Sequence, residues 1–208
     1  MPPVDALSGK SAGELCAAVL AGGKSSRMGR NEAMLRVSGK PMIAHVVEAV
    51  RYATSRVMII SNEAEAYQFL SLPIFPDAVE SCGPLAGIYT ALKHAETRHC
   101  LVVACDLPFL TPSLMRFLCE HGRDCDVFAF ESDTDGLEPL CAVYSRACLP
   151  IIEQQLEAGE HKVSHFFSKV NTRLVRLQPG LAFYIEHVFL NVNTPDELER
   201  ARMLASPD

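Results

Sequence analysis

Short apolar runs alternate with longer amphipathic segments along most of the chain. The runs have the length of strands and are rich in branched residues, and they cover residues 15–21, 56–60, 72–75, 100–104, 126–130, 140–144, 172–177 and 187–190. Between them, apolar positions recur at helical spacing, as at Ile43, Val46, Val47 and Val50. Strands that alternate with helices predict an α/β fold around a mainly parallel sheet.

Proline and capping residues mark where several helices begin. Pro41 opens the helix that carries Val46 and Val47, Thr111 caps a helix with Pro112 at its first position, and Thr194-Pro195 starts the final helix. The pattern also predicts helices over residues 63–70, 83–96, 146–157 and 161–168. No internal repeat interrupts this alternation of strands and helices.

The composition limits the class of protein. Of the 208 residues, 49% are hydrophobic and 21% are charged, which is ordinary globular usage. The formal net charge of -6 argues against nucleic acid or an anionic membrane as a partner, and no apolar run reaches the roughly 20 residues that span a bilayer. We expect residues 1–13 to form a loose leader without a secretory signal, and residues 14–208 to form a single domain.

The eight cysteines bear on the compartment of the protein. They are scattered, several lie in or beside apolar runs, and none forms a C-x-x-C pair. Zinc sites usually show that close pairing. We therefore expect reduced thiols in a cytoplasmic protein.

A Gly-rich segment directly follows the first apolar run. Leu20-Ala21-Gly22-Gly23 leads into a loop that ends at Gly29. Adjacent glycines let the backbone approach a ligand closely, and exposed amides at such a turn bind phosphate oxygens. Lys24, Arg27 and Arg30 add cationic donors. The alternative interpretation is a tight turn with solvated basic residues, since the segment has neither the Walker A nor the G-x-G-x-x-G pattern.

Asp106 directly follows the buried run over residues 100–104. Ligands in α/β folds bind at the carboxyl ends of the strands, so we expect Asp106 and Gly22 to meet at one edge of the sheet. Magnesium takes one or two protein carboxylates together with phosphate and water, which makes Asp106 a candidate ligand and Asn193 a candidate second ligand. The alternatives are an Asx turn at Asp106 and a helix-capping role for Asn193.

Several motifs occur in a characteristic order. They are Leu20–Gly23, Arg27-Met28-Gly29, Gly39-Lys40-Pro41, Pro76-Asp77, Gly83–Gly87, Cys105–Pro108 and Asn191–Pro195. Their order and spacing, from about Ala17 to about Arg200, resemble the molybdenum cofactor guanylyltransferases of the sugar-nucleotidyltransferase-like superfamily.

The resemblance implies a three-layer, Rossmann-like nucleotidyltransferase fold. It implies transfer of GMP from MgGTP to molybdopterin with release of pyrophosphate, with Mg²⁺ as the cofactor, GTP and molybdopterin as small-molecule substrates, and a transient contact with proteins that deliver the cofactor. Cytidylyl transfer to the same cofactor, or nucleotidyl transfer to another small phosphate, remains an alternative.

The resemblance also assigns roles to residues of this chain. Arg27 and Asp106 are the implied catalytic residues, and Asp106 and Asn193 the implied metal ligands. The implied nucleotide-binding residues are Leu20, Ala21, Gly22, Gly23, Asn62, Asp77, Gly83 and Asp106.

One position departs from the family pattern. Glu32 stands where the family usually has a phosphate-binding Lys. Two unit charges about 4 Å apart interact by roughly 4 kcal/mol at an effective dielectric of 20, so this reversal of charge is a large change. Three accounts remain open: Lys24, Arg27, Arg30 or Lys40 supplies the missing charge; Glu32 turns away or binds a second metal ion; or the protein is a weakened, non-catalytic relative.

Overall fold

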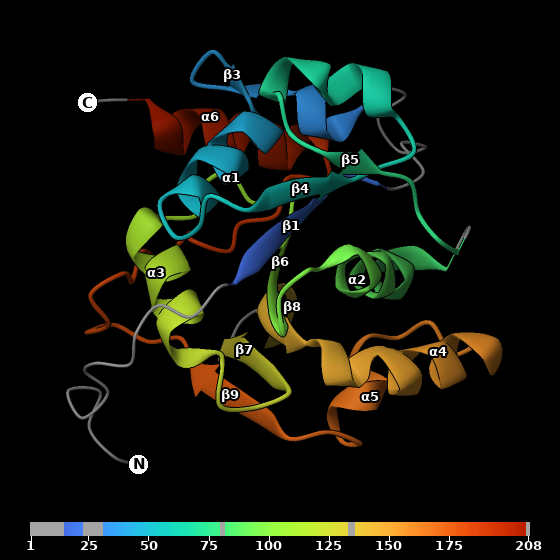
Figure 1. Cartoon of the computed structure of the whole chain (residues 1–208). Coiled ribbons are helices and arrows are strands. Elements are labelled where there is room, and N and C mark those ends of the chain that lie inside the picture. The colour runs from blue at the N-terminus through green and yellow to red at the C-terminus, as the bar shows by residue number, and fades with distance from the viewer. Residues whose placement is uncertain (1–14, 23–30, 80–81, 133–135, 207–208) are drawn as a thin grey trace.

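The computed structural model describes residues 15–22, 31–79, 82–132 and 136–206, which form a central sheet covered by helices (Figure 1). The predicted leader, residues 1–13, lies outside the described residues. The strands of the central sheet are β1 (Cys16–Leu20), β4 (Val57–Ile60), β5 (Ile74–Phe75), β6 (His99–Ala104), β7 (Val127–Ser132), β8 (Gly136–Ser145) and β9 (Thr172–Arg176). The helices are α1 (Met42–Arg51), α2 (Gly83–His94), α3 (Pro112–His121), α4 (Leu149–Glu157), α5 (Ser164–Phe167) and α6 (Pro195–Ala205).

The seven described strands of the central sheet lie in the order β5-β4-β1-β6-β8-β7-β9. All run parallel except β8, which is antiparallel to both of its neighbours, β6 and β7. The mainly parallel sheet predicted from the sequence is therefore confirmed. The reversal follows from chain connectivity, because β7 and β8 are separated by a connection too short for the crossover that parallel strands need.

Side chains of β1 alternate between two apolar layers. Ala17 and Val19 face a core cluster that includes residues of α1 and α3, and Ala18 and Leu20 face a cluster that includes residues of α2 and α4. Figure 1 shows these helix pairs on opposite faces of the sheet. Residues that alternate along a strand point to opposite faces, so a strand buried on both sides is apolar throughout. The three-layer α/β fold is thus confirmed.

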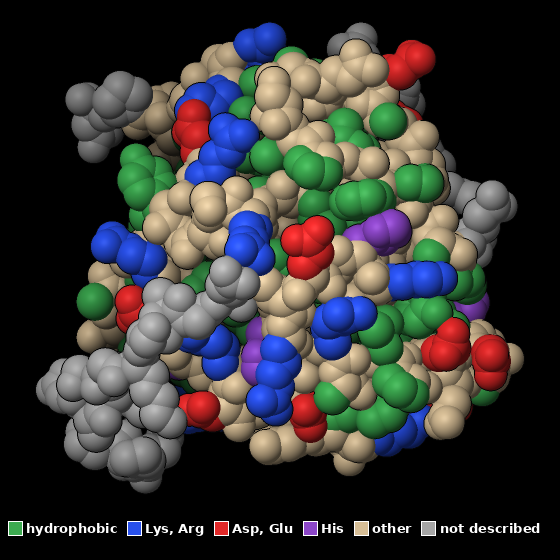
Figure 2. All heavy atoms as spheres, viewed as in Figure 1, with side chains coloured by type: hydrophobic (Ala, Val, Ile, Leu, Met, Phe, Trp, Pro, Cys, Tyr) green, Lys and Arg blue, Asp and Glu red, His purple; other side chains and the backbone are tan. Residues whose placement is uncertain are grey.

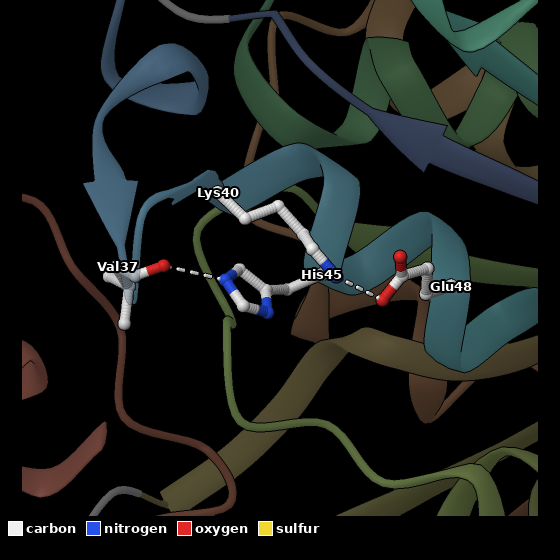
Figure 3. A network of polar contacts seen from close by, with 4 residues as sticks. All are labelled: Val37, Lys40, His45 and Glu48. Atoms are coloured by element: carbon white, nitrogen blue, oxygen red, sulfur yellow. Dashed lines mark hydrogen bonds and ion pairs between the residues drawn. The ribbon is translucent and has the colours of Figure 1, made fainter. Parts of the chain in front are cut away.

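A small hairpin packs beside α1 and α6. It consists of β2 (Arg36–Val37) and β3 (Lys40–Pro41), which pair antiparallel. In Figure 3, the His45 ring of α1 lies 2.8 Å from the Val37 carbonyl oxygen, and the Lys40 ammonium forms an ion pair with Glu48. These contacts hold the hairpin against α1, and the charge of Lys40 is paired with Glu48 of that helix.

Two predicted elements differ in the structure. Residues 187–190 do not form the predicted strand, because their amides are used in local turns: Val188 N–H donates to Ile185 and Leu190 N–H donates to His187. Val188 and Phe189 are apolar because they pack into the core. The helix predicted over residues 161–168 is shorter and covers only Ser164–Phe167.

The surface seen in Figure 2 carries basic and acidic side chains interspersed with polar and apolar ones. Within the described ranges, no helix is long and apolar enough to cross a membrane. Five of the cysteines are buried, and no disulfide joins the cysteines that the structure describes.

Candidate active site

A cavity of about 660 Å³ lies at the carboxyl ends of β1, β4 and β6. Every predicted site residue that the structure describes lines this cavity: Leu20, Ala21, Gly22, Asn62, Asp77, Gly83, Asp106 and Asn193. The other two predicted residues, Gly23 and Arg27, lie outside the described part of the chain. Positions far apart in the sequence are therefore gathered at the sheet edge where the fold predicts a ligand.

The hydrogen-bond ladder of the sheet continues past the strand ends and holds the cavity rim. Ala21 N–H donates to the Ile60 carbonyl at 2.9 Å, and Cys105 N–H donates to the Leu20 carbonyl at 3.1 Å. These bonds bring the residues that follow them, Gly22 and Asp106, to the same edge, as the sequence predicted.

Gly22 closely approaches the loop after β5. A Cβ atom at Gly22 would lie 3.3 Å from the Asp77 Oδ2 atom, a tight contact that glycine avoids. Asp77 is held by Asn62 through two hydrogen bonds: its N–H donates to Asn62 Oδ1 at 2.9 Å, and Asn62 Nδ2 donates to Asp77 Oδ2 at 3.2 Å. Burial raises the pKa of the Asp77 carboxyl, and the Asn62 hydrogen bond partly opposes that shift. One side of the cavity therefore presents a fixed hydrogen-bond acceptor.

Asp106 is the most perturbed carboxyl of the cavity. Its Oδ1 atom is buried and has no hydrogen-bond partner among the described residues. Burial raises the pKa of Asp106 to about 6; hydrogen bonds from its own amide and from the Asn193 side chain lower it, and the carboxylates of Glu32 and Glu197 raise it further. A buried carboxylate oxygen without a donor is costly unless a cation or ligand neutralises it. The donor set is therefore suited to a hard divalent cation.

Asn193 reaches Asp106 from the far end of the chain. Val192 N–H donates to the Asp106 carbonyl at 3.0 Å, which joins the two segments. Thr194, rather than Asn193, caps α6, because Thr194 Oγ1 accepts from Glu197 N–H. The Glu197 carboxylate in turn accepts from the N–H groups of Asn193 and Thr194 at 2.7 and 2.9 Å. The prediction that Asn193 caps α6 was therefore wrong. The Asn193 side chain instead forms a hydrogen bond with the Asp106 carboxyl.

Glu32 also lines the cavity. It begins a 3₁₀ helix over Glu32–Met34 and is half-buried there. Its charge adds to the rise in pKa that burial causes at Asp106, so Glu32 lies within electrostatic reach of the site. Lys40 does not line the cavity in the described structure, and its ammonium is paired with Glu48, so Lys40 is not the replacement cation. The other candidates, Lys24, Arg27 and Arg30, lie outside the described residues.

A second hollow of about 340 Å³ adjoins the first and was not predicted. Leu140 lines both, and the second hollow is also lined by Leu107, Leu137, Glu138, Pro139 and Asn191. Glu138 is almost completely buried, with 6% of its surface exposed. The sequence held one indirect signal, since Asn191 opens the motif that ends at Pro195. Leu140 is therefore the residue at which the two hollows adjoin.

This fold and this site define a class of protein. A three-layer α/β domain carries Gly22 after β1 and Asp106 after β6, and both residues line one cavity. Such a cavity at the carboxyl ends of parallel strands suits a nucleoside triphosphate with a cation. The model of the MobA-like NTP transferase domain matches residues 17–174. The chain belongs to this family and is an enzyme of the nucleotidyltransferase class.

Named relatives agree with this assignment. The chain is 40% identical over 188 residues to a probable molybdenum cofactor guanylyltransferase of Pelotomaculum thermopropionicum, covering 90% of this chain and 91% of the relative. It is 30% identical over 190 residues to the molybdenum cofactor guanylyltransferase of Vibrio parahaemolyticus, covering 90% and 95%. The structure of molybdopterin-guanine dinucleotide biosynthesis protein A from Archaeoglobus fulgidus is similar, with a TM-score of 0.76, 29% identity, and coverage of 90% of this chain and 97% of that chain.

Proposed function

We propose that this chain transfers GMP from MgGTP to molybdopterin and releases pyrophosphate. The observation that carries the proposal is the buried, unpartnered Oδ1 atom of Asp106 in the cavity that Gly22 also lines. The names of the curated relatives support the choice of GMP and of molybdopterin. We further propose that residues 14–208 act as one domain in the cytoplasm, with GTP and molybdopterin as substrates and transient contacts to proteins that deliver the cofactor.

Asp106 and Asn193 would hold the magnesium ion. In the described part of the chain, no group of three or more His, Cys, Asp and Glu side chains could bind a metal ion, so the remaining ligands would be phosphate oxygens and water. Bound there, Mg²⁺ would neutralise charge on the triphosphate as pyrophosphate departs.

The nucleotide would bind in the cavity against Gly22 and Asp77, which both line it. The amide of Gly22, which lines the cavity, would bind phosphate oxygens, the role predicted for the Leu20–Gly23 segment. A carboxylate accepts hydrogen bonds only, and the Watson–Crick edge of guanine offers two adjacent donors, N1–H and the 2-amino group, whereas cytosine offers one. Asp77 therefore favours GTP over CTP.

The acceptor would enter from the second hollow, which adjoins the nucleotide cavity at Leu140. A phosphate oxygen of molybdopterin would attack the α-phosphorus in line with the departing pyrophosphate, forming one P–O bond as another breaks. The chain's contribution is to position the two substrates and to stabilise charge. Arg27 is our candidate for the cationic side chain that acts on the phosphates, as the family resemblance implies.

A second candidate function follows from Glu32. A carboxylate in the same cavity as Asp106 opposes triphosphate binding, and this favours a relative that binds nucleotide or cofactor without turnover. The two functions differ in whether pyrophosphate is released.

The test is a binding panel followed by a turnover assay. The thermal shift produced by GTP, CTP, ATP and UTP is measured with Mg²⁺, and pyrophosphate release is then followed with molybdopterin present. Guanylyl transfer requires the largest shift with GTP and release that depends on molybdopterin. A larger shift with CTP would overturn the guanine assignment, and binding without release would favour the non-catalytic function.

A further inference from the structure

The Tyr67 side chain contacts Ala21 and Asn31 and was not among the predicted site residues. Tyr67 belongs to a 3₁₀ helix over Ala64–Leu70 and is 1% exposed. Its hydroxyl oxygen lies 2.8 Å from Asn31 Nδ2 and 3.4 Å from the Ala21 carbonyl oxygen. Ala21 and Asn31 flank residues 22–30 in the sequence. One hydroxyl therefore contacts residues on both sides of that stretch of sequence.

The direction of these hydrogen bonds is fixed by a neighbouring carboxylate. Asn31 Nδ2 also lies 2.8 Å from Glu63 Oε2, and a carboxylate accepts but cannot donate. The amide nitrogen of Asn31 thus donates to Glu63 and to Tyr67. The Tyr67 proton is then left for an acceptor, either the Ala21 carbonyl or Asn31 Oδ1 at 3.0 Å. Burial raises the pKa of Tyr67 to about 12, so the hydroxyl keeps this proton at neutral pH.

The bond to Ala21 bears on the amide of Gly22. A trans peptide group is planar, and its C=O and N–H point in opposite directions. The preceding peptide group is held because Ala21 N–H donates to the Ile60 carbonyl, and a Tyr67 proton donated to the Ala21 carbonyl then restrains the peptide group that joins Ala21 to Gly22. Holding the carbonyl toward Tyr67 turns the Gly22 N–H away from the hydroxyl, and Gly22 lines the cavity.

We propose that Tyr67 and Asn31 are positioning residues: Tyr67 links Ala21 to Asn31 and thereby orients the Gly22 amide toward the triphosphate. This inference rests on the proposed function for the identity of the ligand. It implies that Tyr67, a core residue, increases nucleotide affinity without contacting the nucleotide.

The test compares Tyr67→Phe with Tyr89→Phe. Both variants remove a tyrosine hydroxyl from a short hydrogen bond, but Tyr89 belongs to the other core cluster and its hydroxyl donates to Glu153. At a temperature where all proteins are folded, we expect Tyr67→Phe to raise the Kd and the KM for MgGTP about tenfold, with little change in kcat. Tyr89→Phe should leave both unchanged. Asn31→Ala should also raise the Kd for MgGTP. The loss of binding free energy in the double variant should be smaller than the sum of the losses in the two single variants, because both residues belong to one network.

A second measurement needs no ligand. Amide hydrogen exchange in peptides covering residues 20–33 should be faster in Tyr67→Phe than in wild type or in Tyr89→Phe. If both the Kd for MgGTP and the amide exchange were unchanged in Tyr67→Phe, the positioning role proposed for Tyr67 would be refuted. Wild-type protein that fails to bind MgGTP would instead refute the proposed function, and the exchange measurement would still decide whether Tyr67 positions Ala21 and Asn31.

Discussion

Glu32 and Asp106 line one cavity, and the charge of Glu32 adds to the rise in pKa that burial causes at Asp106. Glu32 comes from the 3₁₀ helix over Glu32–Met34 and Asp106 from the end of β6. Like charges that share a site disfavour each other's ionised form. A bound cation stabilises both ionised carboxylates, so the pair favours cation binding. The same negative charges repel the phosphates of the nucleotide.

Replacing Glu32 with lysine should tighten MgGTP binding by about tenfold or more. Repulsion of the triphosphate becomes attraction, and partial exposure of the site reduces the roughly 4 kcal/mol expected for a close pair. Isothermal titration of MgGTP checks this. The matched control is Glu48→Lys, which makes the same change of charge at a residue paired with Lys40 away from the cavity. Equal effects of the two variants would show that only net charge matters.

Asp106→Asn should abolish turnover and the stabilisation by Mg²⁺, yet stabilise the metal-free protein at pH 7. The folded-state pKa of about 6 exceeds the ordinary 3.8, so the folded state binds the proton more tightly than the unfolded state. The free energy of unfolding therefore falls as the pH rises from 3.8 to about 6 and stays lowered above it, by about 2 to 3 kcal/mol at about 1.4 kcal/mol per unit of pKa.

Urea denaturation at pH 4 and pH 7, with and without Mg²⁺, measures this effect. Without Mg²⁺, the free energy of unfolding of Asp106→Asn should exceed that of wild type at pH 7 and nearly equal it at pH 4. If Mg²⁺ stabilised the variant as much as wild type, Asp106 would not be the metal ligand.

Asp77→Asn should reduce the preference for GTP over CTP by about tenfold or more, because the carboxamide sets an N–H donor against the donors of guanine. The measurement is the ratio of the two dissociation constants. In wild type, that preference should also decline as the pH falls toward the raised pKa of Asp77, since a protonated carboxyl loses an acceptor. Asn62→Ala, which removes only the group that holds Asp77, should have a smaller effect. An unaltered ratio in Asp77→Asn would remove Asp77 from base recognition.

The capping box of α6 offers a pair of variants that separates stability from cation binding. Thr194→Ala removes the cap and should cost about 1 kcal/mol of unfolding free energy with unchanged Mg²⁺ affinity. Glu197→Ala also releases the N–H of Asn193 and removes a carboxylate whose charge reaches Asp106, so it should additionally weaken Mg²⁺ binding several-fold. Titration with Mn²⁺ followed by electron paramagnetic resonance compares the two. Equal Mn²⁺ affinities would show that Asn193 does not depend on Glu197.

Local patterns in the sequence were enough to predict most of the fold and much of the candidate site. Apolar runs of strand length that alternate with amphipathic segments predict parallel strands and covering helices, because both periodicities arise from nearby residues. A glycine pair or an aspartate directly after such a run must lie at the carboxyl edge of the sheet. This is why Gly22 and Asp106 could be expected in one cavity before any contact between them was known.

The tertiary structure decided what depends on partners distant in the chain. Whether residues 187–190 pair as a strand, and that Thr194 rather than Asn193 caps α6, follow from competition among hydrogen bonds that no local pattern reveals. The position of Glu32 in the cavity lining and the contact of one tyrosine hydroxyl with both Ala21 and Asn31 arise from packing between separate elements. Sequence periodicity determines which face of an element is buried, and only the assembled core determines which polar atoms meet there.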